Sequence, residues 1–76
     1  MTVIMIIKLK YYNPNTTSTD RIVRALRRRL SETEVHGDSG KIFFASMGLS
    51  GIRKEIIDEV LKEEGYGYEI EKEDRL

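Results

Sequence analysis

Residues 33–47 read TEVHGDSGKIFFASM, and this stretch decides which fold the chain adopts. The segments TEVH (33–36) and KIFFASM (41–47) contain the β-branched and aromatic residues that strands favour. GDSG (37–40) lies between them and has the composition of a tight turn. Two strand-like runs separated by a few turn residues predict a β-hairpin. Because TEVH is short, whether it forms a strand sets the number of strands in the sheet.

The hairpin contains HGDSGK (36–41), which partly resembles two functional motifs. GDSG resembles the nucleophile loop of trypsin-like serine proteases, whose triad assembles from distant parts of a large scaffold. Here the only histidine, His36, stands three residues before Ser39 in the same hairpin. A phosphate-binding P-loop would need glycine in place of Val35 and Ser or Thr in place of Ile42. We therefore interpret HGDSGK as a turn, and we predict no catalytic residues.

A strand is expected before the hairpin, in TVIMIIKLKYY (2–12). Strand alternation places one wholly apolar set on a single face: Val3, Met5, Ile7, Leu9 and Tyr11. The opposite face carries Ile4, Ile6, Lys8 and Lys10. We expect the first face to meet the core.

Two helices are expected, one on each side of the hairpin. Thr17 and Asp20 have the spacing of a capping box, which predicts the start of the first helix. Its apolar stripe comprises Ile22, Val23, Leu26 and Leu30. In the second helix, Ser50 is the predicted N-cap and Gly65 the predicted stop. Its predicted buried face comprises Ile52, Ile56, Ile57, Val60 and Leu61.

The segment YGYEIEKE (66–73) predicts a final strand with Tyr66, Tyr68 and Ile70 on one side. The resulting order is β-α-β-β-α-β within one α+β domain spanning residues 1–76. This order predicts a ferredoxin-like sandwich, in which two helices cover one face of a four-stranded antiparallel sheet. If TEVH were not a strand, the alternative would be β-α-β-α-β with a three-stranded sheet.

The segment EIIDEVLKEEGYGYEIE (55–71) is similar to the last helix and strand of small heavy-metal-associated domains. These domains share the β-α-β-β-α-β order, so the resemblance implies the same fold. They bind metal through a Cys-x-x-Cys loop after the first strand, where this chain has NPNTTST (13–19). The resemblance therefore does not extend to metal binding.

Composition limits the functions that the chain can have. The 76 residues include no cysteine, which excludes disulfides, thiolate metal sites and a cysteine nucleophile. We expect no metal and no cofactor, and we expect His36 to be solvated. The apolar run VIMII (3–7) is too short to span a membrane. We therefore expect a cytoplasmic protein with no membrane contact.

Charge is balanced overall but not along the chain. Residues 1–41 hold eight Lys/Arg and four Asp/Glu, whereas residues 42–76 hold five and nine. The strongest basic segment, DRIVRALRRRL (20–30), places Arg21, Arg24, Arg27 and Arg28 along the solvent side of the first helix. This stripe could contact nucleic-acid phosphates. Alternatively, it could face the acidic second helix in solvated ion pairs.

The uncovered face of the sheet is the other candidate surface. In a ferredoxin-like sheet the first and third strands are central, so Ile4 and Ile6 would lie beside Phe43 or Phe44 with no helix above them. RNA-recognition domains place stacking aromatic residues here, but KIFFASM lacks their glycine-aromatic signature. A contiguous exposed apolar patch usually marks an interface. We expect Ile4, Ile6, Lys8 and Phe43 to form a protein interface.

The function expected from the sequence is therefore non-catalytic protein binding. We expect a small regulator, inhibitor or adaptor that binds a protein partner, or itself as a homodimer, through the open face of its sheet. The alternative is a nucleic-acid-binding protein that uses the arginine stripe. Since no acid, base or nucleophile is placed for catalysis, we do not expect an enzyme.

Overall fold

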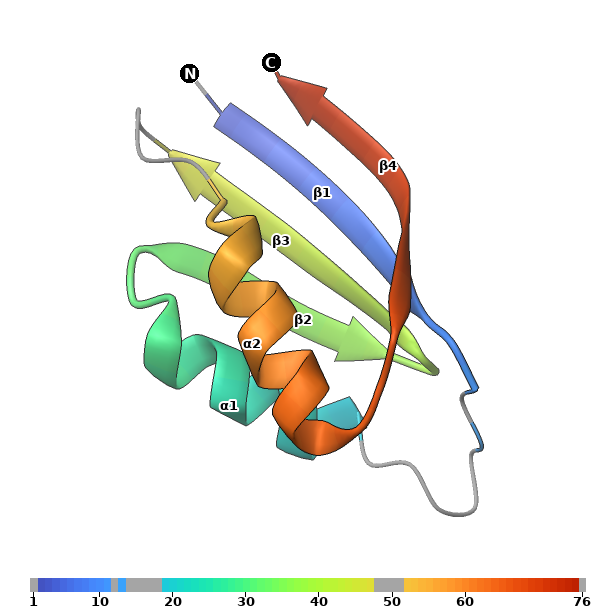
Figure 1. The fold of residues 1–76 in the computed structure, drawn as a ribbon. Coiled ribbons are helices and arrows are strands. Elements are labelled where there is room, and N and C mark those ends of the chain that lie inside the picture. The colour runs from blue at the N-terminus through green and yellow to red at the C-terminus, as the bar shows by residue number, and fades with distance from the viewer. Residues whose placement is uncertain (1, 12, 14–18, 48–51, 76) are drawn as a thin grey trace.

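The computed structural model describes residues 2–11, 13, 19–47 and 52–75 and contains six elements, labelled in Figure 1. In chain order they are β1 (Thr2–Leu9), α1 (Thr19–Arg29), β2 (Thr33–Asp38), β3 (Lys41–Met47), α2 (Lys54–Glu64) and β4 (Tyr68–Arg75). The four strands form one antiparallel sheet in the order β2-β3-β1-β4. The predicted ferredoxin-like order is confirmed, and the three-stranded alternative is wrong.

The hairpin is longer and its turn tighter than the sequence predicted. TEVH does form a strand, but pairing with β3 continues through Gly37 and Asp38. Only Ser39 and Gly40 remain in the turn, and both have positive φ angles, 48° and 84°. Two successive residues in this conformation are typical of a type I′ turn, whose twist matches the flanking strands. The predicted four-residue turn GDSG is therefore wrong by two residues.

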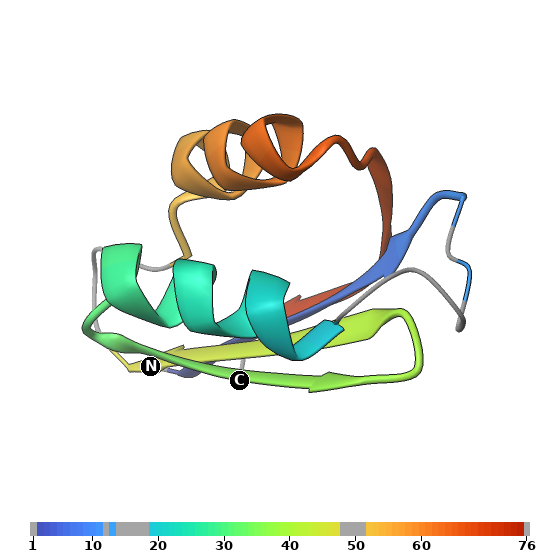
Figure 2. The same ribbon diagram turned by 90° about the horizontal axis from the view of Figure 1, so that it is seen from below.

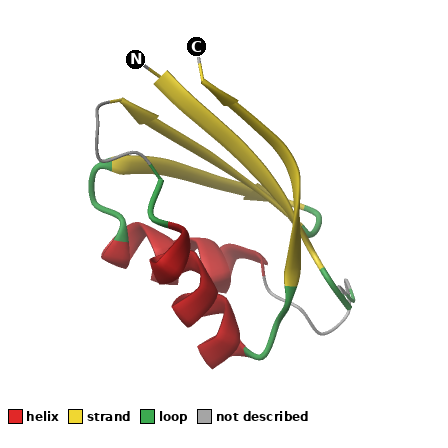
Figure 3. Ribbon diagram, turned by 45° about the horizontal axis from the view of Figure 1, so that its top comes forward, coloured by secondary structure: helices red, strands yellow, loops and turns green. Residues whose placement is uncertain are grey.

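Both helices lie on the same side of the sheet. Figure 2, viewed from below, shows both α1 and α2 above the strands, and Figure 3 shows the same arrangement by element type. Neither α1 nor α2, the helices of the described residues, covers the other face of the sheet. This layout leaves one face for the core and one for solvent or a partner.

The core lies between the helices and the sheet. Its buried apolar side chains come from every element except β4: Met5, Ile7, Leu9, Ile22, Val23, Leu26, Leu30, Val35, Ile42, Phe44, Ile56, Ile57, Val60 and Leu61. From β4, Tyr68 packs against this cluster while half-buried. The predicted stripe of α1 is thus confirmed, as are Met5, Ile7 and Leu9 of the first strand. Val3 is only half-buried, and Ile52 lies before α2 and is partly buried against the core.

Tyr11 does not belong to the core. β1 ends at Leu9, and Tyr11 has a φ of 61° that turns the chain out of the strand direction. Its side chain is consequently 91% exposed. Alternation predicted the wrong side for Tyr11 because it assumed that the strand continued.

The ends of the helices partly follow the sequence signals. Gly65 ends α2 with a φ of 85°, as predicted, and its N–H reaches the carbonyls of Leu61 and Lys62. The predicted N-cap of α2 is wrong: Arg53 holds that position, with no side-chain cap, because the helix begins only at Lys54. Ser50 lies outside the described residues, and so does Thr17, which the sequence predicted for the start of the first helix.

Gly37 allows α1 to lie close to β2. A Cβ atom at this position would come within 2.5 Å of Val23 Cγ2 and 2.7 Å of Thr19 Cγ2. Real Cβ atoms do not approach other carbons so closely, so a side chain here would force the helix and the strand apart. This contact fixes the distance between α1 and the outer strand of the sheet.

Candidate functional surfaces

The face of the sheet opposite the helices carries the residues predicted for a protein interface. Ile4, Ile6 and Lys8 lie on this face of β1, and Phe43 lies beside Ile6 on β3. The structure decides between the two adjacent phenylalanines: Phe44 points into the core at 1% exposure, and Phe43 points outward at 40%. Ile4 and Ile6 are half-buried between their neighbours.

Cross-strand pairing arranges the open face into rows that run from β2 to β4. The Ile6 row consists of His36, Phe43, Ile6 and Lys72. The Ile4 row consists of Glu34, Ala45, Ile4 and Asp74. Each row has two apolar residues in the middle and polar groups at its ends. The ends are basic in the Ile6 row and acidic in the Ile4 row.

A third row closes one end of the apolar patch. This Lys8 row consists of Asp38, Lys41, Lys8 and Glu69. At the other end of the patch, Met47 is 81% exposed and pairs with Thr2. The apolar area is therefore bounded by charge on three sides and continues over Met47 on the fourth.

An irregularity in β4 adds one more acid to the open face. The register between β1 and β4 shifts between Ile6 and Ile7, which leaves Glu71 without a partner of its own in β1. The Glu71 carboxylate lies 3.2 Å from Lys41 Nζ, across the width of β1. Alternation along the sequence could not reveal this contact, because a bulge changes which residues share a face.

The arginines of α1 do not form one uniform stripe. Arg21 forms an ion pair with Glu64 of α2 at 3.3 Å, and Arg29 pairs with Glu59 at 2.8 Å. Of the predicted stripe, only Arg21 therefore pairs with the acidic second helix, and the other pair comes from Arg29, which the stripe did not include. Arg24 and Arg28 are exposed and form no such pair with the residues that the structure describes.

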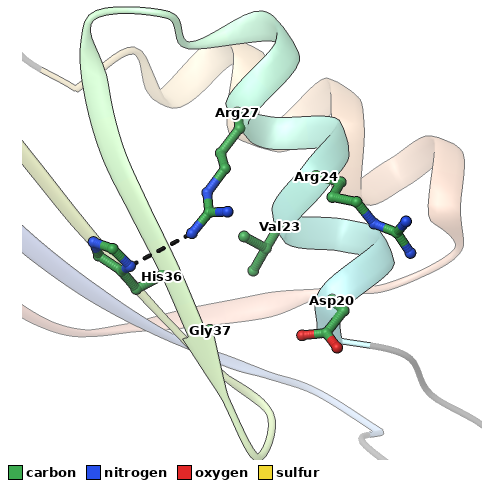
Figure 4. A pocket seen from close by; sticks show the side chains of 6 residues that line it. All are labelled: Asp20, Val23, Arg24, Arg27, His36 and Gly37. Carbon is green, nitrogen blue, oxygen red and sulfur yellow. Dashed lines mark hydrogen bonds between the residues drawn. The ribbon is translucent and has the colours of Figure 1, made fainter.

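Arg27 turns away from the other helix and reaches β2. Its Nε atom donates a hydrogen bond of 2.8 Å to the carbonyl oxygen of Val35. One terminal nitrogen lies 3.5 Å from His36 Nδ1, as Figure 4 shows. For this nitrogen to donate, Nδ1 must be the unprotonated nitrogen of the imidazole. Sequence patterns could not predict that these side chains meet, because they belong to different elements.

Tyr68 links β4 to α2 through a hydrogen bond from its hydroxyl group to the Asp58 carboxylate. Partial burial of the phenol raises the pKa of Tyr68 to about 12, and the hydrogen bond and charge of Asp58 add to this shift. The neutral phenol is therefore the form that the folded state favours.

This shift predicts a stability change at high pH. Because the folded pKa lies above the usual value, the contribution of Tyr68 is fully present below pH 10 and is lost as the pH rises towards 12. Replacing Tyr68 with Phe should cost about 1 kcal/mol near neutral pH, since the pair is partly solvated. In urea unfolding, this difference should shrink towards zero between pH 10 and 12.

Tyr11→Phe provides the control, since Tyr11 is 91% exposed. Its stability curve should run parallel to that of the wild type over the same pH range. A constant difference between Tyr68→Phe and the wild type at all pH values would contradict the pKa shift.

Among the described residues, no three His, Asp or Glu side chains are grouped so that they could hold a metal ion. In the same part of the chain, neither helix is long and apolar enough to cross a membrane. Comparison of the chain with protein-family models, with curated proteins and with solved structures finds no match. Function therefore has to be inferred from the chemistry of the surfaces themselves.

Proposed function

We propose that the chain is a non-catalytic protein-binding module that pairs with a second copy of itself through the open face of its sheet. The observation that carries this proposal is the apolar patch of Ile4, Ile6 and Phe43, which no helix covers. Each isoleucine would contribute about 1.5–3 kcal/mol on going from full exposure to full burial, so half-buried residues would contribute less. A role as a small regulator, inhibitor or adaptor in the cytoplasm is part of the same proposal.

The charges around the patch favour a second copy as the partner. The ends of the Ile6 row are His36 and Lys72, and those of the Ile4 row are Glu34 and Asp74. A twofold axis that runs across the strands, between these rows, would place each Ile6 row over the Ile4 row of the other copy. Basic ends would then meet acidic ends on both sides of the patch.

A twofold axis parallel to the strands is disfavoured. Each row would then face the same row of the second copy, with β4 over β2. Lys72 would lie over His36, and Glu34 would lie over Asp74. Carboxylates would meet at two of the four corners of the patch, which costs free energy, and neither Lys72 would face a carboxylate. We therefore propose that facing strands of the two copies run antiparallel, with the axis across them.

Ile6→Lys tests the surface. It should weaken the dimer at least tenfold, because a buried ammonium group would replace about 1.4 kcal/mol or more of apolar contact. Light scattering after size exclusion over a range of concentrations measures the change. Phe43→Lys should act in the same way, and its side chain is already 40% exposed within one copy.

Ile70→Lys is the matched control for these variants. Ile70 is 44% exposed, close to the value for Phe43, but it pairs with Ile7, whose side chain faces the helices. Ile70→Lys should therefore leave the dimer intact. A wild-type protein that remains monomeric at high micromolar concentration, or a dimer that all three variants weaken equally, would refute the proposed surface.

Lys72→Glu tests the direction of the axis. With the axis across the strands, it would face Asp74 of the second copy at two symmetric places and weaken the dimer about fivefold. Adding Asp74→Lys should restore the affinity. With the axis along the strands, Lys72→Glu would instead face the His36 imidazole and should not weaken the dimer. Lys62→Glu on α2 makes the same change in net charge away from the sheet and should have no effect.

A further inference from the structure

An open groove lies between α1 and the outer strand β2. It is lined by Asp20, Val23, Arg24, Arg27, His36 and Gly37, and its volume is about 470 Å³. Figure 4 shows the groove with Arg27 reaching across β2 towards His36. The guanidinium group of Arg27 thus meets an imidazole in the groove, and Arg24 and Asp20 line it from the helix.

Arg27 is held in place before any ligand arrives. Its hydrogen bond of 2.8 Å to the Val35 carbonyl uses Nε and fixes the plane of the guanidinium group. The remaining N–H groups are directed at the weak contact of 3.5 Å with His36 and at solvent. A guanidinium group that is already oriented loses less side-chain entropy when it binds an anion.

Arg24 supplies a second, movable cation. Its guanidinium group points away from Arg27 and His36 in Figure 4 and forms no hydrogen bond or ion pair with the described residues. The long stem allows it to swing over the groove without breaking an existing contact. Asp20, one helical turn earlier, carries the opposing charge, so the net charge of the lining remains positive.

We propose that this groove binds a phosphate group, with Arg27 as the fixed donor and Arg24 closing over the anion. The flat fork of a guanidinium group matches two phosphate oxygens, and such charge-assisted hydrogen bonds are among the strongest in proteins. Arg27 can donate to the phosphate in place of its long contact with His36. The imidazole donates as well when the proton lies on the nitrogen that faces the anion.

Gly37 and Val23 form the apolar side of the groove. Because Gly37 has no side chain, α1 lies against β2 and the arginine stems start close to the strand. The close approach that the packing requires therefore also sets the position of Arg27 over the Val35 carbonyl. The groove depends on the tertiary contact between α1 and β2 and not on either element alone.

Titration with inorganic phosphate, followed by NMR of backbone amides and arginine Nε–H groups, tests the proposal. A small open site with a few charge-assisted bonds should show a Kd of about 1 mM. Saturable shifts should centre on Gly37, His36 and the Arg27 Nε–H. Shifts no larger than those caused by sodium chloride at the same ionic strength would overturn the proposal.

Arg24→Gln and Arg27→Gln should each weaken phosphate binding about tenfold. Arg28→Gln is the matched control: Arg28 is exposed on the same helix and forms no pair with the described residues, but it does not line the groove. It should change the Kd less than about twofold. If Arg27→Gln disturbs the fold, Arg27→Lys keeps the charge, loses the fork and should still weaken binding. Equal weakening by all the arginine variants would overturn the proposal.

Three probes distinguish the source of the phosphate: inorganic phosphate, a nucleoside monophosphate and a single-stranded oligonucleotide. Tighter binding of the monophosphate, with the same dependence on Arg24 and Arg27, identifies a small phosphorylated molecule. Oligonucleotide binding that is weakened by changes at these two arginines, but not by a change at Arg28, identifies a nucleic-acid phosphate in the groove. If Arg28→Gln weakens the oligonucleotide as much as Arg24→Gln, the exposed surface of α1 is the binding site, and the groove proposal is wrong.

His36 belongs to both the groove and the Ile6 row, whereas Gly37 and Arg27 belong to the groove alone. Ile6→Lys should therefore keep the phosphate shifts at Gly37 and at the Arg27 Nε–H. Loss of the shifts in this variant, with the fold intact, would contradict the assignment to the groove.

Discussion

Phe44→Ala should lower the free energy of unfolding by about 3–5 kcal/mol. Phe44 is 1% exposed and points towards the helices from β3, which is one of the two central strands of the sheet. Its removal would leave a large cavity among side chains of both helices and of the neighbouring strands. Because the core of so small a domain rarely supplies more than about 3–5 kcal/mol, we expect this variant to be largely unfolded at room temperature. Circular dichroism during urea unfolding measures the loss.

Phe43→Ala is its natural control, since it makes the same chemical change one residue earlier. Phe43 is 40% exposed on the open face, so its removal should cost about 1 kcal/mol or less in the monomer. Measurements at low micromolar concentration keep any dimer from contributing to stability. If the two variants were equally destabilised, or if Phe43→Ala were the worse, the register of β3 would be shifted by one residue.

Gly37→Ala should destabilise the fold by about 1–3 kcal/mol, the usual cost of placing extra atoms in a packed contact. The new Cβ atom would lie 2.5 Å from Val23 Cγ2, a branched and buried side chain that has little freedom to move. Either α1 must shift away from β2 or the strand must bend. Thermal unfolding should show a Tm lowered by several degrees.

Gly67→Ala is the matched control for this prediction. Its Cβ atom would meet only the Lys10 stem, at 3.5 Å and 3.8 Å, which is ordinary contact. We expect this variant to be as stable as the wild type or slightly more stable, because alanine restricts the unfolded chain. A Gly37→Ala protein that unfolds at the wild-type temperature would show that α1 is not in close contact with β2.

Gly37→Ala also connects stability to the proposed phosphate site. If α1 moves away from β2, the hydrogen bond between Arg27 and the Val35 carbonyl should lengthen or break. Phosphate affinity should then fall even though no residue that donates to the anion has been changed. The proposed dimer surface lies on the opposite face of the sheet and should keep its affinity.

Local sequence patterns predicted most of the fold. Strand alternation in β1 separated Met5 and Ile7 from Ile4 and Ile6, because successive side chains of a strand point to opposite faces. Helical spacing identified the buried stripes of α1 and α2 for a similar reason. The same patterns predicted the wrong face for Tyr11, where the strand had already ended, and the wrong N-cap for α2, where Arg53 holds that position. Element ends depend on the surroundings as much as on neighbouring residues.

The candidate surfaces were predicted only in part. Residues of single elements, such as Ile4 and Ile6 or Arg24 and Arg28, could be assigned to a face from spacing alone. Spacing alone could not predict the rows of the open face. Nor could it predict the ion pair between Glu71 and Lys41 or the contact between Arg27 and His36. These contacts depend on strand register, on the bulge in β4 and on the distance between α1 and β2.

The sequence by itself determined the type and order of the elements and which face of each is apolar, since these follow from the regular geometry of one helix or strand. Three contacts follow from the tertiary structure only: Phe43 pairs with Ile6, Arg27 reaches β2, and Gly37 lies against α1. The physical reason is that packing joins residues far apart in the chain. Their separation is set by the simultaneous fit of all core side chains and not by local preference.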